Sequence, residues 1–398
     1  MTDRARIARS VLLGDETRVA RHSRVPELGP RVLFFSGGSA LRPLSRRLKR
    51  YTHNSVHLIT PFDSGGSSAI IRDAFHMLSV GDLRNRLMAL ADESQRGNPQ
   101  IYRLFSYRFP KDAEQLALGQ RLERMVEGAD PLVSEVPEPL RRIIRTHLRV
   151  FAENMPPSFD LRGASIGNLM LAAGYLDNER DIDSVIYLFS KLVEVRGVVQ
   201  PTVRDDLHLK AVLEDGSSVI GQHLLTGKEN APIRSSVKEL SLVTSLHEGK
   251  PTDCEIDDKV RNLILRADVI VFPMGSFFSS IIANLLPRGV GAAVRDAQCP
   301  KVYIPNTGVD PEQVALSLDQ RSELLLKYLR KDAGADTPAE KLLNFVLLDT
   351  TARQRTKPGC IEKIRQTGIE LLETRLISEQ STPNIDPELL ARVLVSMG

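Results

Sequence analysis

The chain has 398 residues, of which 42% are hydrophobic and 26% are charged. This is the composition of a globular protein, and the length suits one large domain with insertions or two domains. The formal net charge of +3, and the lack of any apolar run approaching about 18 residues, argue against a protein that wraps nucleic acid and against a membrane protein.

The three cysteines, Cys254, Cys299 and Cys360, form no CxxC pair. Neither a zinc site nor a disulfide framework is therefore indicated, and we expect a cytoplasmic protein. Residues 1–30 are dotted with arginine and lack the continuous apolar stretch of a signal peptide. We interpret them as a mobile or docking arm that precedes one α/β domain over residues 31–398.

Apolar runs in five places predict buried strands. They are RVLFFSGG (31–38), VHLIT (56–60), DVIVFPMGS (268–276), KVYIPN (301–306) and NFVLLD (344–349), and the tail adds a strand within 369–377 and a helix over 387–397. Runs without alternation, separated by helix-like stretches, indicate a mostly parallel, Rossmann-like sheet with helices on both faces. In such sheets ligands bind at the carboxyl ends of the strands.

The segment from residue 83 to residue 160 has apolar residues at three-and-four spacing, which is typical of amphipathic helices. We predict a helical insertion over about residues 91–160. Any apolar helix face left exposed should pair across a twofold axis, so we expect a homodimer. The stretch 207–226 alternates around Asp215 and Gly216, which predicts a β-hairpin, and residues 311–345 look helical.

The first strand runs into SGGSALRPLSRRLKR (36–50). Gly37 and Gly38 permit a tight turn before a helix, and Ser39 follows them. A strand, a glycine turn and a helix aim backbone N–H groups and the helix dipole at one point, which is an anion site in principle. A simple strand-to-helix turn explains the same residues equally well.

The second strand runs into PFDSGGSSAIIRD (61–73). Asp63 stands where a carboxylate can hold Mg²⁺, bind a ligand hydroxyl or merely cap the turn. Gly65 and Gly66 let a ligand approach the backbone, and Ser67 or Ser68 is expected to cap a helix that begins near Ala69. Arg72 lies one turn into that helix, where it could reach a phosphate.

Polar turns recur farther along the chain. Asp82 in GDLRN (81–85) is expected to be the N-cap of a helix that starts at Leu83, and Arg84 and Asn85 follow it. Basic residues oppose the dipole preference of a first helical turn, which suggests that they grip an anion, although solvated arginines are the simpler explanation. Asn168 opens an apolar helix, and Gly275 and Ser276 follow a buried strand.

Six stretches resemble, in order and spacing, the motifs of the CofD-like family. They are SGGSAL (36–41), FDSGGSSAIIR (62–72), GDLRN (81–85), GASIGNLMLAA (163–173), PMGSFFSSIIANLL (273–286) and KVYIPN (301–306). That family includes the 2-phospho-L-lactate transferases of deazaflavin-coenzyme synthesis and the bacterial gluconeogenesis factor proteins. The resemblance implies a nucleotide-diphosphate ligand. In the transferases a guanosine-linked donor passes its phospholactyl group to a deazaflavin hydroxyl, with Mg²⁺ expected, whereas the regulatory members bind a UDP-sugar without known turnover.

Carried onto this chain, the resemblance implies that Asp63 serves Mg²⁺ or the acceptor. The residues implied or expected to contact the nucleotide are Gly37, Gly38, Ser39, Gly65, Gly66, Ser67, Ser68, Arg72, Asp82, Arg84, Asn85, Asn168, Gly275, Ser276 and Asn306. Two departures from the family pattern matter: the second acid of its Asp-Asp pair is Ser64 here, and its histidine before the GN motif is Ala164.

Two functions follow, and neither uses an organic cofactor. The first is a transferase that acts on a nucleotide-diphosphate-linked donor by positioning and electrostatics. The second is a nucleotide-sugar-binding regulatory protein without catalysis, which the two departures favour. Because Asp63 and most of the implied cleft are present, we expect the transferase. A scaffold that binds no ligand would not need so many polar turns at strand ends.

Overall fold

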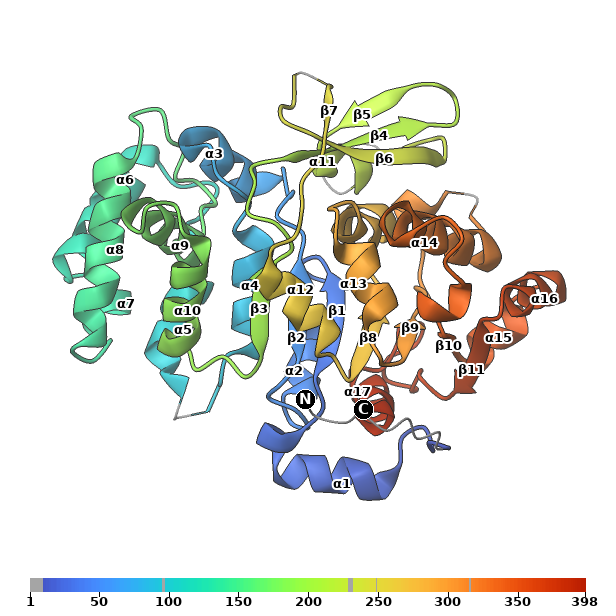
Figure 1. Ribbon diagram of the computed structural model, residues 1–398. Coiled ribbons are helices and arrows are strands. Elements are labelled where there is room, and N and C mark those ends of the chain that lie inside the picture. The colour runs from blue at the N-terminus through green and yellow to red at the C-terminus, as the bar shows by residue number, and fades with distance from the viewer. Residues whose placement is uncertain (1–9, 95–96, 228–231, 248, 315) are drawn as a thin grey trace.

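A seven-stranded sheet forms the centre of the computed structural model, which describes residues 10–94, 97–227, 232–247, 249–314 and 316–398 (Figure 1). Every neighbouring pair of strands in it runs parallel. Across the sheet the strands are β11 (Glu370–Thr374), β10 (Phe345–Asp349), β9 (Lys301–Tyr303), β8 (Val269–Phe272), β1 (Val32–Ser36), β2 (Val56–Ile59) and β3 (Val198–Pro201). The predicted α/β fold is confirmed, and β3 is the one strand of this sheet that the sequence did not predict.

Helices cover both faces of this sheet because successive strand residues point to opposite sides. Leu33 and Phe35 of β1 belong to a core on one face, and Val32 and Phe34 belong to a core on the other. The helices α12 (Asp258–Leu265), α13 (Val290–Asp296), α14 (Leu318–Ala333) and α16 (Pro358–Gln366) pack on the first face, and α2 (Arg42–Leu48) and α17 (Pro387–Met397) pack on the second. The short helix α15 (Thr350–Arg355) follows β10.

A third core lies among the helices between β2 and β3. They are α3 (Gly66–Phe75), α4 (Gly81–Leu90), α5 (Pro99–Ser106), α6 (Gln115–Glu127), α7 (Pro131–Ser134), α8 (Leu140–Asn154), α9 (Ile166–Asp177) and α10 (Ile182–Leu192). Leu122 and Met125 of α6 and Ile144, Leu148 and Phe151 of α8 are buried within the chain. The apolar faces that motivated the homodimer are therefore occupied, and the homodimer stays a prediction without that support.

A small antiparallel sheet lies above the carboxyl ends of the large one (Figure 1). Its order is β5 (Ser218–Ile220), β4 (His208–Leu213), β6 (Val237–Val243) and β7 (Pro251–Thr252). The pair β4–β5 is the predicted hairpin, which ends before residue 226 because α11 (Gln222–Leu225) follows it directly. The sequence did not predict β6 or β7.

The N-terminal arm docks on the C-terminal helix. Helix α1 (Glu16–Arg24) buries Val19, and the Gly14 amide donates to Ser396 Oγ at 2.9 Å. The Arg18 guanidinium donates to the Ser396 carbonyl at 2.6 Å. Of the two predicted states of the arm, residues 10–30 adopt the docked one, and residues 1–9 lie outside the described residues.

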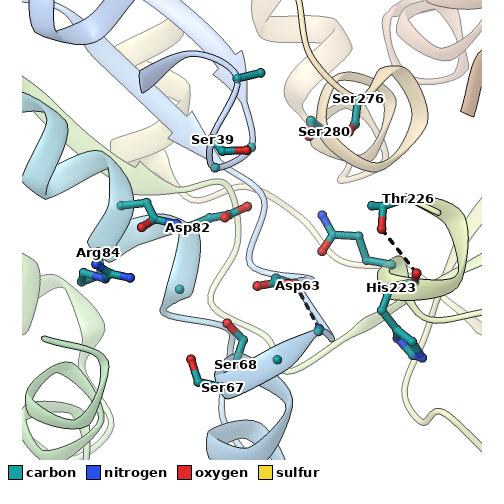
Figure 2. A pocket seen from close by; sticks show the side chains of 18 of the residues that line it. Ser39, Asp63, Ser67, Ser68, Asp82, Arg84, His223, Thr226, Ser276 and Ser280 are labelled. Carbon is teal, nitrogen blue, oxygen red and sulfur yellow. Dashed lines mark hydrogen bonds between the residues drawn. The ribbon is translucent and has the colours of Figure 1, made fainter. Parts of the chain in front are cut away.

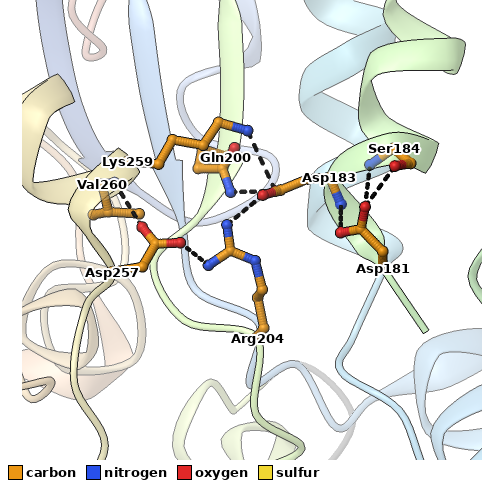
Figure 3. A network of polar contacts seen from close by, with 8 residues as sticks. All are labelled: Asp181, Asp183, Ser184, Gln200, Arg204, Asp257, Lys259 and Val260. Carbon is orange, nitrogen blue, oxygen red and sulfur yellow. Dashed lines mark hydrogen bonds and ion pairs between the residues drawn. The ribbon is translucent and has the colours of Figure 1, made fainter. Parts of the chain in front are cut away.

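A polar network ties the helical segment to the main sheet near the edge strand β3 (Figure 3). The Arg204 guanidinium forms ion pairs with Asp183 of α10 and with Asp257, which caps α12. Asp183 also accepts from Gln200 of β3 at 2.7 Å and pairs with Lys259 at 3.4 Å. These contacts fix the helical segment against the sheet.

Among the described residues, no helix has both the length and the apolar character needed to cross a membrane.

Candidate functional site

A cavity of about 720 Å³ opens at the carboxyl ends of β1, β2 and β8. This is the size of a cavity that binds a small-molecule ligand, and its place is the crevice that ligands occupy in parallel α/β sheets. Its lining comes from segments far apart in the chain, namely 35–41, 63–70, 81–85, 108–111, 160–168, 222–226 and 273–281.

Most of the residues expected from the sequence line this one cavity. They are Gly37, Gly38, Ser39, Asp63, Gly65, Gly66, Ser67, Ser68, Asp82, Arg84, Asn85, Asn168, Gly275 and Ser276. Figure 2 shows Asp63 near the middle of the labelled side chains, with Ser39 and Asp82 on one side and His223 and Thr226 on the other. Arg72 and Asn306 are not among the lining residues.

The turn after β1 is held tightly from two directions. A Cβ built on Gly37 would lie 2.3 Å from Ser280 Oγ, and one built on Gly38 would lie 1.9 Å from Asp82 Oδ1. The fully buried Arg86 donates to the carbonyl of Gly37 at 2.9 Å and to that of Gly38 at 3.1 Å. Both glycines are therefore required by close approach, and Arg86 fixes the turn without itself lining the cavity.

The turn after β2 is organised by Asp63. Its Oδ1 accepts the Gly65 amide at 3.1 Å, which is the turn-capping role, one of the three roles that the sequence left open. Helix α3 begins at Gly66, whose φ is +48°, with Gly65 as its N-cap and no side-chain cap. The expected cap by Ser67 or Ser68 is therefore wrong, because both serines already lie inside the first turn.

Helix α4 also begins earlier than expected, by two residues. It starts at Gly81, so Asp82 lies in its first turn, and its N-cap is Val80 without a side-chain cap. The Asp82 carboxylate instead packs against the turn at Gly38. The first turns of α3 and α4 thus both border the cavity, and the Gly81 amide at the start of α4 donates to Ser79 Oγ at 3.4 Å.

Arg72 requires a correction. Its side chain is 4% exposed and pairs with Asp206 at 2.5 Å, and it also donates to the carbonyls of Leu207 at 2.7 Å and of Asp63 at 3.2 Å. It therefore joins α3 to the segment before β4 instead of reaching into the cavity. Its contact with the Asp63 carbonyl makes it a support of the turn.

Arg84, unlike Arg72, lines the cavity. Its Nε donates to Asn168 Oδ1 at 3.2 Å, and Asn168 in turn donates to Ser67 Oγ at 3.3 Å. Burial, together with the nearby charges of Arg108 and Arg42, lowers the pKa of Arg84 to about 10 although Asp82 opposes the shift. Burial and like charges thus destabilise the charged form of this side chain, and a bound anion would stabilise it.

Gly275 and Ser276 lie after β8, and Asn306 and the buried Glu312 hold this turn. Asn306 accepts the Gly275 amide at 2.7 Å, so it positions the turn from outside the lining. Glu312, which is fully buried, accepts from the amides of Phe278 and Ser279 at 2.9 and 2.8 Å. Burial and the neighbouring Asp310 raise the pKa of Glu312 to about 7.

The sequence missed several polar lining residues, among them Arg108, Lys111, Asp160, Arg162, Gln222, His223 and Thr226. His223 is held by Ser64, whose Oγ lies 2.8 Å from His223 Nδ1. The position that holds a second acid in the family motif thus positions a cavity histidine in this chain. Ala164, where the motif has histidine, is 2% exposed. A Ser–His pair 159 residues apart carries no local sequence signal.

The cavity can hold a cation only with help from a ligand. Among the described residues, no group of three or more His, Cys, Asp or Glu side chains could hold a metal ion. Asp63 and Asp82 both line the cavity. Mg²⁺ is usually bound by one or two carboxylates, with substrate phosphates and water completing its shell, so this donor set fits Mg²⁺.

Comparison with known proteins gives consistent matches. The family model described as 2-phospho-L-lactate transferase CofD matches residues 32–377. The gluconeogenesis factor of Bacillus subtilis is 28% identical over 376 residues, which cover 92% of this chain and 98% of that protein. The gluconeogenesis factor of Listeria monocytogenes is 28% identical over 281 residues, which cover 70% of this chain and 67% of that protein.

The fold has a solved counterpart. The crystal structure of a UPF0052 family protein from Bacillus halodurans matches with a TM-score of 0.65 at 22% identity, covering 92% of this chain and 99% of that one.

Proposed function

Because the chain belongs to the CofD family, we propose that its cavity binds a nucleotide-diphosphate-linked donor and transfers the substituted phosphoryl group to an acceptor hydroxyl. The observation that carries this proposal is that two glycine turns, Asp63, Asp82 and Arg84 line one cavity of about 720 Å³. Phosphoryl-type transfer needs mainly positioning and charge stabilisation, and these groups supply both.

The diphosphate would bind between the glycine turn after β1 and the first turns of α3 and α4. The turn at Gly37 and Gly38 and the first turn of α3 both border the cavity, and neither α3 nor α4 has a side-chain cap. The backbone N–H groups and the partial positive charge of a helix N-terminus favour phosphate oxygens. Arg84 lies in the same first turn of α4 and adds a full positive charge.

The transfer itself is a displacement at phosphorus. The acceptor oxygen forms a bond to the phosphorus that carries the substituent, and the bond from this phosphorus to the bridging oxygen breaks. The electron pair leaves with the nucleoside monophosphate, and Asp63 accepts the acceptor proton or orients the hydroxyl. When bound, Mg²⁺ held by Asp63 and Asp82 would neutralise charge on the diphosphate.

A second function has specific support, namely nucleotide-sugar binding without turnover. Ser64 is committed to His223 at 2.8 Å and supplies no carboxylate, and Ala164 supplies no imidazole. The relatives named gluconeogenesis factor cover most of this chain. In this alternative the same cavity binds a UDP-sugar without turnover, and the bound protein regulates a partner.

Thermal-shift measurements with GDP, UDP, a UDP-sugar, CDP and ADP, each with and without Mg²⁺, test the ligand class. A nucleotide at ten times its dissociation constant stabilises the protein by about 1.4 kcal/mol. Arg84→Ala should abolish the shift, whereas Arg149→Ala, which removes an exposed arginine of α8, should preserve it. If none of these ligands shifts melting at millimolar concentration, the proposed function is wrong.

Turnover separates the two functions. Phosphorus NMR of the protein with a guanosine-linked phospholactate donor and a deazaflavin acceptor should reveal release of GMP if the chain is a transferase of this type. A UDP-sugar that stabilises the protein, with no change in any donor tested, supports the regulatory function.

A further inference from the structure

On the side toward the helical segment, the lining of the cavity includes the cations Arg108 and Lys111, which follow α5. Within the part of the chain that the structure describes, neither forms an ion pair with a carboxylate. Arg162 also lines the cavity but differs, because it pairs at 2.9 Å with Asp160, another lining residue. Two positive charges at this rim are therefore left without a protein anion.

The loop at Gly163 organises both cations. The Arg108 guanidinium donates to the Gly163 carbonyl and to Ser67 Oγ, the latter at 3.1 Å. Gly163 has a φ of +69°, and a Cβ placed on it would lie 3.2 Å from Lys111 Cγ, so the Lys111 methylenes pack over its Cα. Arg108 and Lys111 therefore both contact Gly163, one through its carbonyl and the other by packing over its Cα.

The cations lie at one end of an asymmetric cavity. Arg108 contacts Ser67, which links it through Asn168 to Arg84. The opposite side, formed by the α11 residues Gln222 and His223 and by Thr226, has polar groups but no Lys or Arg (Figure 2). Burial lowers the pKa of Arg108, and this charge in turn lowers the pKa of Arg84, so the cluster is unfavourable until an anion binds.

We propose that Arg108 and Lys111 form a second anion subsite, distinct from the glycine turns, that binds the carboxylate or phosphate of a small acidic substrate beside the diphosphate. The inference rests on the proposed function for the neighbouring diphosphate site. Both cations come from the helical segment, so this segment sets which second substrate the cavity accepts. An uncharged second substrate would leave the positive charges of Arg108 and Lys111 without a counter-charge.

Calorimetric titrations of phosphoenolpyruvate, inorganic phosphate and L-lactate test the subsite, each with and without saturating GDP and Mg²⁺. The variants are Lys111→Ala and Lys111→Glu. Lys327→Ala is the matched control, because it removes an exposed lysine of α14 that does not line the cavity. Arg108 is left intact because its hydrogen bonds hold the loop.

Phosphoenolpyruvate should bind the parent protein, and the two single-group probes reveal whether its phosphate or its carboxylate is recognised. Lys111→Ala should weaken that binding about fivefold and Lys111→Glu about 25-fold, the effects of losing and of reversing one partly exposed charge contact. Lys327→Ala and the GDP affinity of all variants should stay within a factor of two.

The proposal is overturned if no acidic probe binds at 10 mM (about the weakest useful affinity, near 2.7 kcal/mol) or if Lys111→Glu binds like the parent. If GDP binds and the acidic probes do not, the subsite is wrong and the diphosphate site stands. If the acidic probes bind in a Lys111-dependent way and no nucleotide does, the subsite stands and the proposed function falls.

Discussion

Replacing Gly38 by alanine should damage the site more than the fold. The added Cβ would lie 1.9 Å from Asp82 Oδ1 and 2.7 Å from Asp82 Cγ, so the carboxylate must move by about 1 Å or more to reach an ordinary contact. Overpacking costs about 1–3 kcal/mol, and the loss of unfolded-state entropy returns about 0.4–1 kcal/mol. Because the obstacle is the end of one short side chain, the net destabilisation should be about 1 kcal/mol.

Binding should suffer more, since Asp82 would be turned away from its place in the cavity. We expect Gly38→Ala to weaken Mg²⁺-dependent nucleotide binding at least tenfold, about 1.4 kcal/mol. Urea unfolding measures the stability, and calorimetric titration of GDP with and without Mg²⁺ measures the binding. The matched control is Gly119→Ala in α6, where no atom lies within 4 Å of the added Cβ and where about 1 kcal/mol of stabilisation is expected.

A double variant isolates the cause. If the collision with Asp82 is the whole effect, Gly38→Ala combined with Asp82→Ala should be more stable than the sum of the two single changes predicts, with a coupling of about 1 kcal/mol. The reasoning is refuted if Gly38→Ala behaves like Gly119→Ala in both stability and nucleotide binding.

Three further changes test other parts of the site. Asp63→Asn should leave urea unfolding within about 1 kcal/mol, because asparagine can still accept the Gly65 amide, but it should remove the Mg²⁺ dependence of GDP titration and any turnover. Arg72→Gln should destabilise the protein by about 3 kcal/mol in the same unfolding assay while changing GDP affinity less than threefold, because it breaks a largely buried pair with Asp206 outside the cavity. Glu312 has a folded pKa of about 7, above the ordinary value of 4.5, so its contribution to stability is fully present below pH 4.5 and lost as pH rises through 7. Unfolding free energies of the parent minus those of Glu312→Gln, measured between pH 5 and 8, should therefore fall by a few kcal/mol with increasing pH.

Each of these has an outcome that contradicts it. Normal Mg²⁺-dependent turnover in Asp63→Asn would leave that carboxylate with a purely capping role. A tenfold loss of GDP affinity in Arg72→Gln at unchanged stability would show that Arg72 binds the ligand. A flat difference curve for Glu312→Gln would mean that the carboxyl titrates alike in the folded and unfolded states.

The strands were largely predictable because strands buried on both faces are continuous apolar runs. RVLFFSGG and VHLIT have this character, whereas β3 is only VVQP, with a polar residue and a proline in four positions. The turns at strand ends were predictable because glycine marks them: Gly37 and Gly38 allow close approach of neighbouring side chains, and Gly66 and Gly275 adopt a positive φ.

Side-chain direction could not be predicted. Arg72 and Arg84 both lie in helices that follow a glycine near the cavity, but Arg72 meets Asp206, which is 134 residues away in the sequence. Lys111 and His223 reach the cavity only through tertiary packing of the helical segment and of the small sheet. No spacing near either residue marks it as part of the site.

The strand order has a consequence for how the chain folds. Strand β1 pairs with β8, and the Arg31 amide, just before β1, bonds to the Asp268 carboxylate 237 residues away. During synthesis, the edge of β1 that pairs with β8 therefore stays unpaired until about two thirds of the chain has emerged. Such long-range parallel pairing makes folding slow and leaves the intermediate prone to aggregate. Refolding from denaturant should accordingly take seconds or longer, and its yield should fall as protein concentration rises.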